Sequence, residues 1–393
     1  MSTEALIAPE RQLLTGGEAV AHAMRQIDPD VVPVYPITPQ TPIIQAFAQF
    51  AADGRATGEL VDVESEHSAM SAAIGSALAG ARTMTATSSQ GLALMAEVVY
   101  IASAMRAPIV TALGNRALSG PINIHCDHSD SMLIRDSGVV QLFVENAQEA
   151  YDATILAPRL AEHPDVLLPV FVCLDGFTIT HSAEPVELLD DTEVQRFVGD
   201  YRIPFPLLDA PQATTQGPFA MPDYYFELKH QQVAAMAAAG EVLDKLVDEL
   251  EGFTGRRYEP LERYRLDDAA RAIVLMGSSA GTAKDVVDEL RNRHQPVGLL
   301  RIGSFRPFPA EGVREALHGV AEVAVLDRAD SPGGAPPLFA EVAAANDGRA
   351  RLRSVVYGLG GRELHPGDIE GIFESLRERV PATPTYVGLR SVQ

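Results

Sequence analysis

Three short polar segments of the sequence follow apolar runs that are typical of buried strands. The carboxyl ends of parallel strands are where open α/β sheets bind ligands. The free amides at the start of a helix suit an anion or a polar ligand, a guanidinium fork suits a carboxylate, and a threonine would present its hydroxyl at the crevice. The segments are Thr38 after the run 31–35, Ser-Ser-Gln-Gly at 88–91 after the run 83–87, and Arg116 after the run 108–113.

Glu66 opens the stretch 66–82, whose many small residues indicate a helix. A carboxylate at this position either complements the helix dipole, which is a structural role, or faces a heterocycle bound at the edge of the sheet. The small residues that follow would let a flat ring or another helix approach. The other three segments also fit structural roles (a rigid turn, a capped helix start and a surface arginine), and spacing alone leaves these alternatives open.

Two further patterns point to other chemistry. Residues 125–130, His-Cys-Asp-His-Ser-Asp, hold several metal-binding side chains. A zinc site would draw further ligands from a distant segment, so we expect a polar loop and no metal. Gly-Ser-Ser-Ala-Gly at 277–281 matches the nucleophile elbow of hydrolases, with Asp327 and His365 following in hydrolase order. A serine hydrolase that uses Ser279 is therefore one alternative function, and a non-catalytic scaffold is another.

The elements that must position these segments alternate between strand and helix up to about residue 190, which predicts a parallel sheet covered on both faces. Prolines at 204, 206, 211, 218 and 222 exclude regular structure over 203–223, where we expect an extended arm. A second α/β unit begins near residue 268. The expected strands are 31–35, 83–87, 108–113, 167–174, 272–276, 297–301, 322–326 and 354–357, and the expected helices are 66–82, 91–105, 224–250, 282–294 and 337–345.

Composition narrows the classes of function. The chain has 393 residues, enough for two or three domains at about 100–200 residues each. Its net charge of −22 repels phosphate backbones and anionic lipids, so nucleic acid and membrane surfaces are poor partners. Two cysteines, Cys126 and Cys173, are too few for an iron–sulfur cluster or a disulfide framework, which fits a reducing cytoplasm. We expect neither a secretory signal nor a membrane insertion.

Taken together, the motifs resemble those of the α subunit of 2-oxoacid:acceptor oxidoreductases, the pyruvate:ferredoxin oxidoreductase family. The resemblance covers nearly the whole chain, and its specificity comes from many short matches in order. The matching segments are Gly16–Ala19, Tyr35–Pro39, Ser65-Glu66, Ser88–Gly91, Asn115–Ser119, Asp127–Asp130, Arg135–Gly138, Asp175–Phe177, Thr180-His181, Arg301, Phe305–Pro309 and Gly358–Arg362.

The resemblance implies both the fold and the roles of residues. Residues 1–265 would form a thiamin-diphosphate-binding α/β domain of the pyrimidine-binding type that carries the arm at 203–223. Residues 266–393 would form a transketolase C-terminal-like α/β domain. The implied catalytic and binding residues are Glu66, at N1′ of the thiamin aminopyrimidine; Thr38 and Arg116, at the carboxylate of the substrate; and Pro36, Ile37, Ser89 and Gln90, at the cofactor.

The sequence also departs from a complete enzyme of this kind. The Gly-Asp-Gly…Asn signature that binds Mg²⁺ and the diphosphate is missing, and so are cluster-binding cysteines. The resemblance therefore implies a heteromer with β-, γ- and δ-type subunits, in which the partners supply Mg²⁺ and [4Fe-4S] clusters and coenzyme A is a co-substrate. Ferredoxin, or NAD through a flavin subunit, would accept the electrons. The substrate would be pyruvate or a larger branched or aryl 2-oxoacid such as phenylglyoxylate, and the bulk of Leu133 counts slightly against pyruvate.

Overall fold

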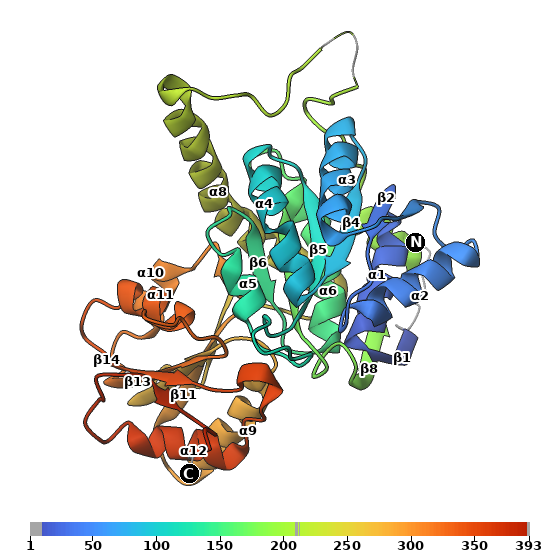
Figure 1. Cartoon of the computed structure of the whole chain (residues 1–393). Coiled ribbons are helices and arrows are strands. Elements are labelled where there is room, and N and C mark those ends of the chain that lie inside the picture. The colour runs from blue at the N-terminus through green and yellow to red at the C-terminus, as the bar shows by residue number, and fades with distance from the viewer. Residues whose placement is uncertain (1–9, 209–210, 212, 391–393) are drawn as a thin grey trace, which may run out of the picture.

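The computed structural model describes residues 10–208, 211 and 213–390. These residues form two α/β units, one built on a seven-stranded sheet and the other on a six-stranded sheet (Figure 1). The α/β fold class expected from the sequence is confirmed. None of the helices among the described residues is both long and apolar enough to cross a membrane.

The larger sheet is parallel except for one edge strand, which comes from the C-terminal half of the chain and runs antiparallel. Across the sheet the order is β12 (Ser304–Arg306), β6 (Val140–Phe143), β7 (Val170–Asp175), β5 (Ile109–Asn115), β4 (Thr83–Thr87), β2 (Val31–Val34) and β3 (Glu59–Asp62).

Helices cover both faces of this sheet, because alternate residues of each strand point to opposite sides. On β7, Val170 and Val172 join one core, and Phe171 and Cys173 join the other. The first core lies under α1 (Gly16–Ile27), α2 (Thr41–Ala52), α6 (Ala147–Ala161), α7 (Asp191–Val198) and α8 (Pro222–Thr254), and the second lies under α3 (Glu66–Ala79) and α4 (Ser89–Ala104).

The smaller sheet has the order β15 (Thr385–Tyr386), β14 (Arg351–Val356), β13 (Glu322–Asp327), β10 (Arg271–Leu275), β11 (Val297–Ile302) and β9 (Leu261–Tyr264). Only β9, which belongs to this sheet although it precedes residue 265, runs antiparallel to its neighbour. The helices around it are α9 (Ser279–Asn292), α10 (Ala310–Ala316), α11 (Pro337–Ala345), α12 (Pro366–Ser375) and the short 3₁₀ helix Leu359–Gly361.

The proline-rich segment 203–223 lacks regular structure over most of its described residues, as its prolines predict. The described residues from 203 to 221 contain neither an α-helix nor a strand, and Figure 1 shows residues 213–221 running outside the body to the free end of α8. Leu207 donates its backbone amide to Leu78 at 2.8 Å. Phe219 is 92% exposed and Phe205 65% exposed. Pro222 was expected in the arm but starts α8, where a residue without an N–H is tolerated.

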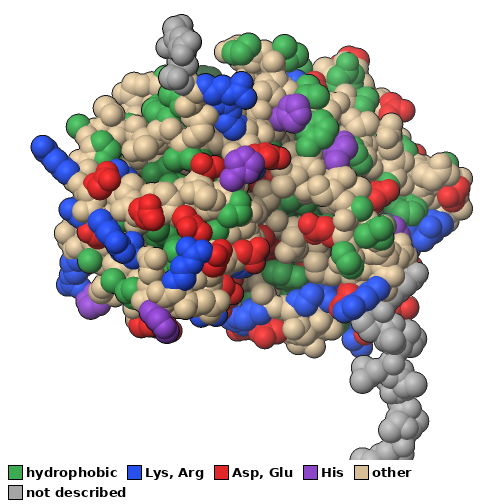
Figure 2. Space-filling model, turned by 90° about the horizontal axis from the view of Figure 1, so that it is seen from below, with side chains coloured by type: hydrophobic (Ala, Val, Ile, Leu, Met, Phe, Trp, Pro, Cys, Tyr) green, Lys and Arg blue, Asp and Glu red, His purple; other side chains and the backbone are tan. Residues whose placement is uncertain are grey.

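A short antiparallel pair, β1 (Glu10–Thr15) with β8 (Ala183–Leu188), lies apart from both large sheets. The underside of the molecule, shown in Figure 2, mixes acidic, basic, histidine and hydrophobic side chains, so this face carries no large patch of a single charge.

The two units share one continuous core. Residues of α3, α4 and β5 pack in the same apolar cluster as residues of β10, β11, β13 and α11. Arg301 of β11 is almost fully buried and reaches the other unit, where its Nη2 lies 2.7 and 2.6 Å from the two carboxylate oxygens of Glu149 and 3.0 Å from the carbonyl of Phe143. This ion pair therefore fastens the C-terminal unit to α6 and β6.

We predict that Arg301→Met lowers the melting temperature of the protein by several degrees. The substitution leaves the Glu149 carboxylate buried without its cation, and breaking such a pair costs about 3–5 kcal/mol. Arg263→Met is the matched control, because Arg263 pairs with Asp267 on the surface with both side chains exposed, and such pairs contribute about 0–1 kcal/mol. Equal melting temperatures for the two variants, measured by circular dichroism, would contradict the prediction.

Candidate active site at the strand ends

The segments that the sequence singled out come together at one edge of the larger sheet. Strands β2, β4 and β5 are neighbours and parallel, so the residues that follow them share an edge. The segments 35–40, 88–91 and 115–118 all begin there.

Arg116 and Thr38 are brought into direct contact. The Arg116 side chain is buried, and its Nη1 donates to the carbonyl of Thr38 at 3.0 Å and its Nε to the carbonyl of Asn123 at 2.8 Å. No hydrogen bond of Nη2 is found in the described part of the chain, so one nitrogen of a fixed guanidinium is left for an anion. Thr38 itself is exposed.

Glu66 begins α3, after Ser65, whose side chain accepts a hydrogen bond from the amide of Ser68. Glu66 is 7% exposed, and no hydrogen bond or ion pair to its carboxylate is found among the described residues. Its oxygens are not among the fully buried atoms without a partner, so they reach solvent. The carboxylate is therefore free to accept a hydrogen bond from water, from a ligand or from another chain.

Gly91 explains how α4 approaches Glu66. A Cβ atom added at Gly91 would lie 2.7 Å from Oε1 of Glu66 and 2.6 Å from Oγ1 of Thr87. Such distances are shorter than any real Cβ contact, so only glycine lets the first turn of α4 pack against this carboxylate. The start of α4 and the start of α3 thus form one narrow cradle.

Several buried polar atoms at the same strand ends have no partner. The structure gives no hydrogen-bond partner to Oε1 of Gln40, Oγ1 of Thr87, Oγ of Ser88 or Oδ1 of Asn115 in the described residues. Buried polar groups are nearly always paired in native proteins, with protein, water or ligand. These atoms come from three neighbouring strand ends, and together with Glu66 they fit a polar heterocyclic cofactor such as the pyrimidine of thiamin diphosphate.

Asp130 links two of the segments, and sequence reasoning gave it no role. Its carboxylate is completely buried and accepts hydrogen bonds from the amides of Ser89 (3.0 Å), Arg116 (2.9 Å) and Ser131 (2.8 Å) and from Nδ2 of Asn115 (2.8 Å). Burial raises the pKa of Asp130 to about 6, against the opposing effect of these donors. In the sequence it stood out only as part of the matching segment 127–130 and of the run of potential metal ligands at 125–130.

Ser89 and Gln90 lie beside this network. The hydroxyl of Ser89 lies 2.6 Å from the carbonyl of Ala117 and 2.7 Å from Oε1 of Gln90. Ser89 is fully buried and Gln90 partly exposed. Pro36 is exposed and Ile37 partly exposed, so this side of the site is open in the isolated chain.

Cys126, His128 and Asp175 form a close group of potential metal ligands, with ligand atoms within 4.8 Å of one another. The oxygens of Asp175 are already used: Oδ1 lies 2.7 Å from Nε2 of His128, and Oδ2 accepts from Arg328 (2.7 Å) and from the hydroxyl of Ser278 (2.5 Å). Burial raises the pKa of Asp175, but Arg328 and His128 outweigh burial and hold it well below its usual value. A guanidinium beside the carboxylate makes this an ion network between the two units, not a cation site.

The serine hydrolase alternative is wrong. Ser279 is the first residue of α9, but Asp327 accepts the backbone amides of Leu338 (2.6 Å) and Phe339 (3.0 Å) at the start of α11. His365 precedes α12 with its side chain 68% exposed and lies 3.7 Å from Glu363. No hydrogen bond joins Asp327 to His365 among the described residues, so the three groups do not form a triad.

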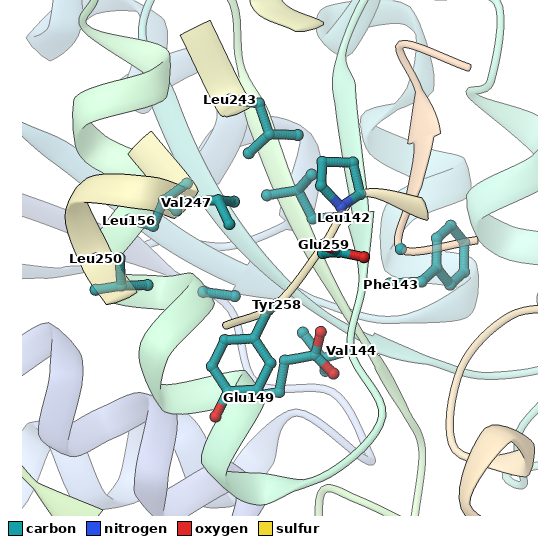
Figure 3. Close-up of a pocket in the computed structure, with 13 residues that line it drawn as sticks. Leu142, Phe143, Val144, Glu149, Leu156, Leu243, Val247, Leu250, Tyr258 and Glu259 are labelled. Carbon is teal, nitrogen blue, oxygen red and sulfur yellow. The ribbon is translucent and has the colours of Figure 1, made fainter. Parts of the chain in front are cut away.

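An apolar pocket lies elsewhere, between α6, α8 and the segment 258–260 (Figure 3). Leu243, Val247 and Leu250 of α8 face Leu142 and other residues across it. Its volume is about 40 Å³, and a single water needs about 10–15 Å³ of such volume. The pocket therefore has room for a few waters and is too small for a substrate or cofactor.

Comparisons with known proteins identify the family of the chain. Residues 22–248 match the family model described as "Pyruvate flavodoxin/ferredoxin oxidoreductase, thiamine diP-bdg", and residues 269–369 match "Pyruvate:ferredoxin oxidoreductase core domain II". The chain belongs to the pyruvate:ferredoxin oxidoreductase family. It is thus a chain of an oxidoreductase family that acts on 2-oxoacids, with a thiamin-diphosphate-binding domain, as its motifs indicated.

Several relatives in this family align over almost their whole length. The chain is 54% identical to pyruvate synthase subunit PorA of Thermotoga maritima over 97% of this chain and 98% of that one. It is 45% identical to the PorA of Methanocaldococcus jannaschii, again over 97% and 98%. The ketoisovalerate oxidoreductase subunit VorA of Pyrococcus abyssi is 37% identical over 94% of each chain.

Two solved structures share the fold. The 2-oxoglutarate:ferredoxin oxidoreductase from Magnetococcus marinus superposes with a TM-score of 0.73 and 19% identity, over 94% of this chain and 65% of that one. A split-gene transketolase superposes with a TM-score of 0.52 and 12% identity, over 92% and 93%. At these identities the likeness concerns the fold alone.

We predict that Gly91→Ala lowers kcat/KM for the 2-oxoacid at least about tenfold in the assembled enzyme, because the new methyl group displaces Glu66 and Thr87. Gly75→Ala is the control, since a Cβ added at Gly75 in α3 meets nothing within 4 Å. Steady-state kinetics with both variants check the expectation. A Gly91→Ala enzyme as active as Gly75→Ala would show that the close approach is not needed.

Proposed function

We propose that this chain is the α subunit of a thiamin-diphosphate-dependent enzyme that converts pyruvate and coenzyme A into acetyl-CoA and carbon dioxide. The observation that carries the proposal is Glu66, a residue 7% exposed whose carboxylate has no hydrogen-bond partner in the described chain and lies in a cradle closed by Gly91. An aminopyrimidine protonated at N1′ is a donor of the kind this carboxylate lacks. Pyruvate is favoured over branched or aryl 2-oxoacids because relatives at 54% and 45% identity are named pyruvate synthase.

Each proposed residue has a definable task. Glu66 accepts the hydrogen bond from N1′ and so holds the proton on that ring nitrogen. Arg116 offers Nη2 to the carboxylate of the substrate, and Thr38 offers its hydroxyl, with the backbone of Thr38 already fixed by Nη1 of Arg116 at 3.0 Å. Bound thiamin diphosphate supplies the electron sink for loss of carbon dioxide. The protein therefore contributes binding, orientation and charge.

Pro36, Ile37, Ser89 and Gln90 complete the proposed cofactor site. Ser89 acts from within, since it is buried and tied to Ala117, whereas Pro36 and Ile37 form part of the open wall. Exposed residues beside a largely buried carboxylate are the arrangement expected of a site that two chains share. A β-type subunit would close this wall and hold the diphosphate through Mg²⁺.

The remaining parts of the reaction require other chains. Both cysteines of this chain are buried, and burial raises the pKa of each thiol well above its usual value, which disfavours the thiolate form that binds iron. The [4Fe-4S] clusters would therefore lie in partner subunits, with γ- and δ-type chains completing the complex. The electrons would pass to ferredoxin, or to NAD through a flavin subunit.

The decisive test is Glu66→Gln in the complex purified through a tag on this chain. We expect pyruvate oxidation to fall by at least about a hundredfold, because the amide cannot hold charge at N1′, while the subunits still co-purify. Glu64→Gln is the matched control, since Glu64 is exposed two residues earlier. Thiamin diphosphate and iron are quantified in each preparation; a wild-type complex that holds neither, or a fully active Glu66→Gln enzyme, would refute the proposed function.

A further inference from the structure

The two segments that carry Ser89 and Arg116 have no sheet pairing to hold them together. The hydrogen-bonded register between β4 and β5 ends at Thr87 and Leu113. Beyond that pair the chains separate into the start of α4 and the loop after β5. One direct hydrogen bond joins them, from the hydroxyl of Ser89 to the carbonyl of Ala117 at 2.6 Å, and among the described residues no backbone amide of either segment bonds to the other.

Asp130 connects the backbone amides of the two segments. Its Oδ2 accepts the amides of both Ser89 and Arg116, at 3.0 and 2.9 Å, and its Oδ1 accepts Nδ2 of Asn115 and the amide of Ser131, both at 2.8 Å. An ionised carboxylate is acceptor-only, with about four lone-pair sites, and here four donors use them. One oxygen atom thus bridges the two segments directly.

The hydrogen bonds to Asp130 hold Ser89 in an unfavourable backbone conformation and fix the position of Arg116. Ser89 has φ of +44°, in the left-handed region that favours glycine. Its amide points to Asp130 and its hydroxyl lies 2.6 Å from the carbonyl of Ala117. Arg116 is similarly fixed at both ends, by its amide on Asp130 and by its guanidinium on the carbonyl of Thr38.

The segment that carries Asp130 is itself braced by the C-terminal unit. Asp127 accepts the amide and hydroxyl of Ser129 at 3.0 and 2.5 Å, and its other oxygen accepts the amide of Gly360 at 3.2 Å. Asn123, whose carbonyl accepts Nε of Arg116, donates its side chain to the carbonyl of Gly360 at 3.0 Å. The turn around Gly360 therefore supports both Asp130 and Arg116.

We propose that Asp130 is the positioning residue of the 2-oxoacid site: its carboxylate sets the distance between the start of α4 and Arg116, and thereby the affinity for the substrate carboxylate. This inference rests on the proposed function. Asp130 touches neither substrate nor cofactor in this proposal. It acts through the backbone of Ser89 and Arg116, so its loss changes substrate binding more than the chemistry that follows.

The test compares Asp130→Asn with Asp152→Asn in the assembled complex. In either orientation, the NH₂ group of the asparagine faces two of the four N–H donors that Asp130 accepts. Because two donors repel each other, the start of α4 and the loop after β5 move apart. Asp152 is the matched control: it is a buried carboxylate on α6 that accepts from Arg256 (2.7 and 2.8 Å) and Tyr258 (2.9 Å), and none of these partners belongs to the strand-end segments.

For Asp130→Asn we expect the KM for the 2-oxoacid to rise at least about tenfold, with kcat reduced by less than about threefold. The KM for coenzyme A and the thiamin diphosphate content stay at wild-type values. The increase in melting temperature caused by the 2-oxoacid, a readout that needs no turnover, shrinks in parallel. Asp152→Asn lowers the melting temperature of the protein and leaves the KM for the 2-oxoacid unchanged.

An unchanged KM for the 2-oxoacid in an Asp130→Asn enzyme whose melting temperature falls like that of the control would overturn the inference. If Asp130→Asn does not assemble, Asn115→Ala removes one donor and keeps the carboxylate; its KM should rise about threefold, and an unchanged KM again overturns the inference. A wild-type complex without thiamin diphosphate refutes the proposed function itself, whereas an active wild type with an unaffected Asp130→Asn refutes only the role of Asp130.

Discussion

The carboxylate of Asp175 lies fully buried at the end of β7, and the cation that compensates it, Arg328, comes from the other α/β unit. A carboxylate in such surroundings is tolerated only with a close cation and satisfied hydrogen bonds, which His128 and Ser278 complete. The two units must therefore dock for either one to be stable at this point. The same docking brings the turn at Gly360 against residues 123–127, so the architecture of the candidate site depends on this ion network.

Much of the fold was predictable, because its strands are apolar runs and its breaks are marked by prolines. The strand Thr83–Thr87 and the helix 337–345 have the expected bounds, and α9 begins three residues before its expected start. Each half of the chain contributes one strand to the sheet of the other half, and this was not predictable. β9 joins the second sheet and β12 the first, through antiparallel pairs that depend on tertiary packing and leave no periodic signal in so few residues.

The candidate site was predictable only in part. Residues that follow buried strands were found because parallel strands end at a common edge, and Thr38 and Arg116 do meet there. Asp130 was missed as a functional group, since it lies on a five-residue helix, α5 (Ser129–Leu133), and its importance arises from donors far away in the sequence. Leu133, whose bulk drew attention, is 45% exposed at the end of that helix. Sequence patterns predict strands and helices better than they predict a hydrogen-bond acceptor, such as the carboxylate of Asp130, that joins segments distant in the sequence.

The continuous core under α3 and α4 extends without a break into the second sheet. A hinge needs a boundary with few packed side chains and a segment free to bend. The described residues offer neither between the two units, because the Arg301–Glu149 and Arg328–Asp175 ion pairs both cross this boundary. The described part of the chain therefore behaves as one rigid body. In the proposed complex, the movement that admits a substrate and then excludes water would belong to the partner chain and to its contact with this one.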